Sequence, residues 1–122
     1  MIIHGKDFRF AGTVEGIEKL GRLCPGGNIE TIDSFLESAS ISESLEFMRN
    51  AIVVLNTAYA DYMKEWEGEE VPRLTVGQAK ALTMPVLREA MQEALKAMNA
   101  DAQATMEISA KKNGMNEVKG EG

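Results

Sequence analysis

The chain has 122 residues, 44% of them hydrophobic and 26% charged, with 13 basic against 19 acidic residues and a formal net charge of −6. This size fits one domain with a modest core, and the composition argues against wholesale disorder. The negative field repels phosphate backbones and anionic lipid, so we expect neither a nucleic-acid partner nor a membrane partner.

Neither membrane insertion nor secretion is indicated by the apolar segments. The longest apolar run, residues 51–55, is far short of the about 20 residues that a membrane span needs, and no long apolar secretory segment opens the chain. The single cysteine, Cys24, has no partner for an internal disulfide, which agrees with a reducing compartment. We therefore expect a cytoplasmic protein in which Cys24 is a buried free thiol.

The first ten residues alternate apolar and polar side chains on either side of Gly5-Lys6, which predicts a short β-hairpin with glycine in its turn. Phe8 and Phe10 share one face, and that face must pack on helices because two strands alone are marginal in water. Thr13 then caps a predicted helix that Pro25 ends. The apolar stripe of this helix is Val14, Ile17, Leu20, Gly21 and Cys24.

Glycines at positions 26 and 27, just before another helical segment, raise the alternative of a phosphate-binding loop. Such a loop normally follows a buried strand and carries a lysine or hydroxyl at a fixed offset, and neither is present. The end of one helix and the start of the next account for every residue. Pro25 ends the first helix, the glycines permit positive φ, and Asn28 caps the next helix. That helix carries Ile29, Ile32, Phe35 and Leu36.

A long amphipathic helix follows, opened by a capping box of Ser40 and Glu43. Its stripe runs at steps of three and four residues through Leu45, Met48, Ile52, Leu55, Tyr59, Tyr62 and Trp66. Small or apolar neighbours widen this surface beyond a coiled-coil seam, which predicts the central helix of a bundle with its tyrosines in the core. Residues 65–72 hold four acids and form a predicted exposed loop, and they lack the ligand register of a calcium loop.

Thr75 and Gln78 form a second capping box, which opens a short helix through Leu82, and Thr83 caps a long last helix. The stripe of the last helix is Met84, Leu87, Met91, Leu95, Met98, Ala102 and Met106. Methionine suits surfaces that accept varied apolar partners. The section from Met84 to Leu95 is expected to pack in the core. Beyond Asn99 the stripe weakens to alanines, so Met98 and Met106 are expected at an exposed, partner-binding end.

Together these elements predict a mainly helical (α+β) protein, in which a short N-terminal β-hairpin packs on a bundle of four to five helices. Residues 1–108 form the predicted domain, and residues 109–122, polar and rich in glycine, form a predicted disordered tail. The candidate partner-binding residues are Met91, Met98, Met106 and Trp66.

We find no constellation of residues that would support catalysis. His4, the one histidine, lies in the hairpin and has no second histidine or nearby cysteine with which to form a zinc site. Carboxylate pairs such as Glu43 and Glu46 lack the Glu-x-x-His motif of di-metal bundles. No dinucleotide, nucleophile-elbow or phosphate-loop motif occurs. We expect no enzyme activity, no cofactor and no metal.

Four stretches resemble phage tail assembly chaperones of the type encoded in prophages of low-GC bacteria: "MIIHGKDFRF", "KLGRLCPGGN", "NAIVVLNTAYADY" and "PRLTVGQAKALTMPVLREAMQEAL". Together they reach from Met1 to about Leu95. The resemblance implies a small helical protein, absent from the finished virion, that binds the apolar tape-measure protein and keeps it soluble while the tail tube polymerises around it. A structural tail or head-tail connector subunit is the alternative, and a homo-oligomer is left open.

Overall fold

The computed structural model describes residues 1–101, and it confirms a mainly helical fold with a short antiparallel hairpin at the N-terminus. Met106, the predicted domain boundary at residue 108 and the predicted tail of residues 109–122 lie outside the described residues. The elements within the described part are β1 Ile2–Ile3, β2 Lys6–Asp7, α1 Val14–Leu23, α2 Ile32–Ser38, α3 Ile41–Tyr62, α4 Val76–Lys80 and a last helix over residues 84–101.

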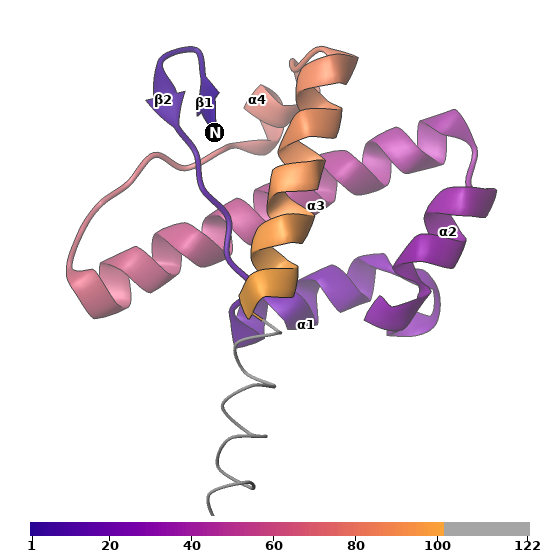
Figure 1. Ribbon diagram of the computed structural model, residues 1–122, viewed down its shortest axis with the longest axis horizontal. Helices are drawn as coiled ribbons and strands as arrows, with labels where there is room; N and C mark the ends of the chain where they lie inside the picture. Colours follow the sequence, from indigo (N-terminus) through magenta and orange to yellow (C-terminus); the bar gives the residue numbers. More distant parts are fainter. Residues whose placement is uncertain (102–122) are drawn as a thin grey trace, which may run out of the picture.

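The longest of these helices, α3, is the scaffold for the rest. Figure 1 shows α3 running across the molecule, with the hairpin and α4 on one side of it and α1 and α2 on the other. The last helix, drawn in orange, crosses α3. One end of α3, drawn in pink, extends past the other elements before the chain turns back toward α4.

The hairpin turn lies one residue earlier than the sequence indicated. Ile3 pairs with Lys6, so the turn consists of His4 and Gly5, and the expected Gly5-Lys6 turn is wrong. Both turn residues have positive φ, 49° at His4 and 78° at Gly5. This combination is the one that a type I′ turn requires, and its twist matches that of the paired strands.

The predicted punctuation around α1 is confirmed. The Thr13 hydroxyl accepts a hydrogen bond from the Gly16 N–H at 3.1 Å, and the helix ends at Leu23, two residues before Pro25. One residue of its predicted stripe does not face the core, because Val14 is 79% exposed. Val14 is the first residue of α1.

The glycines between α1 and α2 also adopt the predicted conformation. Gly26 and Gly27 have φ values of 68° and 70°, which a side chain at either position would disfavour. The Asn28 side chain accepts a hydrogen bond from the Glu30 N–H at 2.9 Å and opens a short 3₁₀ turn, Ile29–Thr31, that leads into α2. The residues therefore end one helix and begin the next.

Both predicted capping boxes are present. The Ser40 hydroxyl accepts from the Glu43 N–H at 3.1 Å, while the Glu43 carboxylate accepts from the Ser40 N–H at 3.2 Å. Thr75 and Gln78 repeat the arrangement at the start of α4, at 3.0 and 2.9 Å. Each box satisfies two backbone N–H groups that an uncapped helix would leave without a partner.

The end of α3 is not a plain α-helix. Residues Met63–Glu67 form a π turn, in which the Gly68 N–H donates to the carbonyl of Met63 five residues earlier. Gly68 then takes a left-handed conformation, with φ 67°, and ends the helix. The wider turn changes the helical register after Tyr62, so that Trp66 no longer continues the buried stripe.

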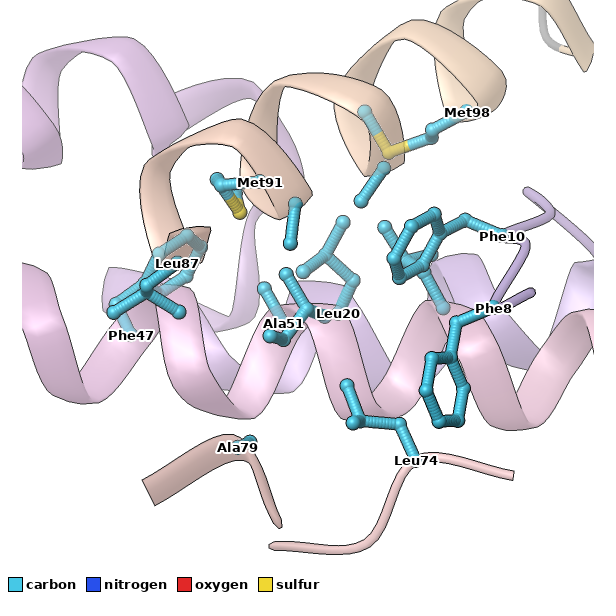
Figure 2. Packing of buried hydrophobic residues seen from close by; sticks show 14 of the residues in the cluster. Phe8, Phe10, Leu20, Phe47, Ala51, Leu74, Ala79, Leu87, Met91 and Met98 are labelled. Carbon is cyan, nitrogen blue, oxygen red and sulfur yellow. The ribbon is translucent and has the colours of Figure 1, made fainter. Parts of the chain in front are cut away.

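A single cluster of buried hydrophobic side chains draws on the hairpin and on every α-helix of residues 1–101 (Figure 2). α1 comes very close to α3, because a Cβ atom on Gly16 would lie 2.8 Å from the Cβ of Ala58. The segment after the hairpin also comes close to the last helix, where a Cβ on Gly12 would lie 3.1 Å from the Cα of Met98. Two glycines therefore set how tightly two pairs of elements pack.

Asn56 is the one fully buried polar side chain among the described residues. Its amide group donates to the carbonyl of Arg9 at 2.9 Å and accepts from the Leu74 N–H at 2.6 Å. Asn56 thereby fixes two irregular segments to the middle of α3, one that precedes this helix in the sequence and one that follows it. No helix within residues 1–101 combines the length and apolar character that crossing a membrane would require.

Candidate protein-binding groove

An open groove of about 720 Å³ lies beside the second half of α3. Its walls are the second half of α3 with the π turn, the segment of residues 10–13, and the first turns of α1. Two small residues, Gly16 and Ala58, form part of its lining at the point where α1 and α3 approach each other closely.

Three large exposed side chains surround this groove. Trp66 is 78% exposed, Val14 is 79% exposed and Tyr62 is 45% exposed, and all three line the groove. They come from three local causes already described: the π turn, the first position of α1 and the overhanging last turn of α3. Scattered exposed apolar residues are normal, but a tryptophan grouped with two others at a groove is typical of a contact surface.

The polar groups of the groove are mostly acidic. Four carboxylates line it, those of Glu15, Asp61, Glu65 and Asp101, against the single ammonium group of Lys19. Three of these carboxylates have internal partners. Glu15 pairs with Lys19 at 3.0 Å, Asp61 pairs with Arg73 at 2.8 Å, and Asp101 accepts from the Gly12 N–H at 2.6 Å.

Glu65 differs from the other three acids of the groove, since it forms neither an ion pair nor a side-chain hydrogen bond within the described part of the chain. It precedes Trp66 directly, and Glu67 follows, so the most exposed aromatic ring of the chain stands between two exposed carboxylates. The groove therefore combines an apolar lining with a negatively charged rim.

The structure separates the four residues that the sequence marked for partner binding. Trp66 lies at the groove and is exposed, so its proposed role stays open. Met91 and Met98 are only 4% and 9% exposed and belong to the core, as Figure 2 shows, so the expected exposed end at Met98 is wrong. The reason is the close approach of Gly12 to Met98. Met106 lies outside the described residues.

Two groove residues were missed because the sequence assigned them to buried stripes. Tyr62 and Val14 continue the helical spacing of core residues, yet both lie at helix ends that no other described element covers. Met84, expected in the core, is likewise 43% exposed at the start of the last helix. In each case the position of the residue at a helix end could have indicated its exposure. An apolar stripe is no longer covered where the neighbouring element ends.

The thiol of Cys24 lies at the C-terminal end of α1, outside the groove lining, and is buried and free as predicted. Burial raises its pKa, and the thiol donates weakly to the Leu20 carbonyl at 3.5 Å. A protonated, enclosed thiol is a poor nucleophile. Within residues 1–101, no three histidine, cysteine or acidic side chains gather as metal ligands would.

The chain was compared with protein-family models, with curated proteins and with solved structures. None of the three comparisons found a match.

Proposed function

We propose that the protein is a chaperone that captures an apolar helical segment of another protein in the groove beside Trp66 and holds it without chemical turnover. The observation that carries this proposal is the exposure of Trp66, Tyr62 and Val14 around one open groove. Aromatic side chains contribute much of the energy at protein interfaces, and amphipathic helices commonly bind by laying their apolar face into such a groove.

The resemblance to phage tail assembly chaperones supplies the identity of the partner. We propose that the segment belongs to the tape-measure protein and that capture takes place in the host cytoplasm, before the tail tube encloses the tape measure. The net charge of −6 suits this role, because chaperone molecules repel one another and keep the complex from aggregating. The groove offers contact area for binding and no group placed for bond-making, so we propose a binding protein and not an enzyme.

Co-expression with the tape-measure protein of the same phage or prophage tests this function. We expect the tape-measure protein to remain in the soluble fraction and to co-purify with the chain. A tape-measure protein that stays insoluble would refute the proposal, and finding the chain in purified phage particles would favour a structural tail or connector subunit instead.

Two matched substitutions place the contact on the groove. Val14 and Ile41 are both exposed, β-branched and first in their helices, but only Val14 lines the groove. We expect Val14→Ser and Trp66→Ala to reduce co-purification strongly, while Ile41→Ser leaves it unchanged. Circular dichroism should show all three variants folded, because none of these side chains is buried. Equal losses for Val14→Ser and Ile41→Ser would place the contact elsewhere.

A further inference from the structure

The charges around the groove narrow the chemistry of its occupant. We infer that the groove takes an amphipathic helix whose apolar face is flanked by lysine or arginine side chains, an inference that rests on the proposed function. Four carboxylates and one ammonium group line the groove, and the pairing of Asp61 with Arg73 adds one further positive charge at its edge. With Glu15 offset by Lys19 and Asp61 offset by Arg73, the carboxylate of Glu65 keeps the rim negative.

The surroundings of Trp66 make the same point at closer range. The ring is exposed, and the carboxylates of Glu65 and Glu67 flank it along the chain. A cation placed over the face of an indole is attracted by the ring, and nearby carboxylates attract it further. An acidic side chain at the same place would meet only repulsion. The position of Trp66 therefore favours a basic residue next to the apolar face of the partner.

Two other occupants fit the charges less well. A second copy of this chain would bring a net charge of −6 and, in a symmetric dimer, an identical acidic rim against this one. The segment of residues 102–122 carries three lysines and three glutamates, so it brings no net positive charge to complement the rim. A separate basic amphipathic helix satisfies both the apolar lining and the negative rim.

Trp66 supplies the means to test this, because it is the single tryptophan of the chain. The probes are two synthetic peptides of about 18 residues, long enough for a few helical turns. Both lack tryptophan and share one leucine-rich face. One carries lysine at the flanking positions and the other glutamate. Binding to the full-length protein is followed through the emission of Trp66, which shifts to shorter wavelength when the exposed ring is covered.

We expect the lysine peptide to shift the Trp66 emission and to bind about tenfold more tightly than the glutamate peptide at low ionic strength, with the difference shrinking as salt screens the rim. Glu15→Gln with Glu65→Gln should remove most of the preference. Glu89→Gln with Glu93→Gln is the matched control, because it removes the same two charges from the last helix, outside the groove, and should keep the preference.

Equal affinity for the two peptides, or tighter binding of the glutamate peptide, would overturn the inference. The inference would also fail if the Trp66 emission of the free protein were already shifted to shorter wavelength. A shift that does not depend on protein concentration would identify residues 102–122 as the occupant. A shift that grows with protein concentration would identify a second copy. The proposed function is refuted by a different result, namely a tape-measure protein that stays insoluble when it is co-expressed with the chain. If the tape-measure protein co-purifies and the peptides bind equally, only the basic-helix inference is lost.

Discussion

Replacing Asn56 by alanine should destabilise the fold by about 2 to 4 kcal/mol, although the substitution removes no charge and little apolar surface. Alanine leaves the buried N–H of Leu74 without its 2.6 Å partner, which costs about 1 to 3 kcal/mol. It also leaves the carbonyl of Arg9, which is partly buried, without its 2.9 Å partner, for about 1 kcal/mol more. This sum is a large fraction of the stability of a small domain.

Urea denaturation followed by circular dichroism measures the loss, and a second variant separates hydrogen bonding from packing. Asn56→Leu refills the space but leaves the same two backbone groups unpaired, so we expect it to be about as unstable as Asn56→Ala. Asn99→Ala, on the exposed surface of the last helix, should change the unfolding midpoint little. An Asn56→Leu variant as stable as the wild type would show that the two hydrogen bonds contribute nothing net, and the reasoning would be refuted.

Three further substitutions or treatments follow from the described contacts. Gly16→Ala should lower the unfolding free energy by about 1 to 3 kcal/mol, because the new methyl group would lie 2.8 Å from the Ala58 Cβ. Adding Ala58→Gly should recover part of this loss in urea denaturation, and a double variant with no recovery would contradict the contact. Ser40→Ala should lower the urea midpoint most near neutral pH. Hydrogen bonding to the side chain and then the backbone of Ser40 lowers the pKa of Glu43, so this stabilisation is present above the usual glutamate pKa and is lost as the pH falls through the lowered value; a midpoint difference that grows in acid would contradict it. Cys24 should react with a thiol reagent slowly in the folded protein and quickly in urea, since burial raises its pKa, and fast reaction without urea would show that the thiol is accessible.

The local signals in the sequence predicted the helix boundaries well. The capping boxes at Ser40 and Thr75 and the helix end before Pro25 were readable because each is complete within a few consecutive residues. The hairpin turn was placed one residue late for a related reason. A glycine was expected to open the turn, whereas His4 adopts the left-handed conformation in its place.

The contacts that the sequence did not reveal all depend on residues far apart in the chain. Nothing near Asn56 in the sequence indicates that Arg9 and Leu74 will bond its two amide atoms. Met98 looked exposed because its own helix weakens into alanines, but it is covered by a segment 86 positions earlier that contains Gly12.

The candidate groove was predictable only in part, for the same physical reason. The step of four from Tyr62 to Trp66 is the spacing of a buried stripe, and burial depends on whether a neighbour reaches that turn. α3 runs past its neighbours, as Figure 1 shows, and its last turn widens. The spacing therefore identified the residues of the surface, while only the arrangement of the helices determined that they face outward.

The bonds that hold the segment after the hairpin bear on the order in which the molecule is completed during translation. The Arg9 carbonyl has its hydrogen-bond donor only after Asn56 is translated. The Gly12 N–H has its acceptor only after Asp101, 89 residues further on, is translated. The ribosome releases the first dozen residues long before either anchor exists, so one wall of the groove stays unfixed on the nascent chain. Under the proposed function, a nascent copy that has not yet reached Asp101 lacks this fixed wall, and we expect it to bind a partner more weakly than the finished protein.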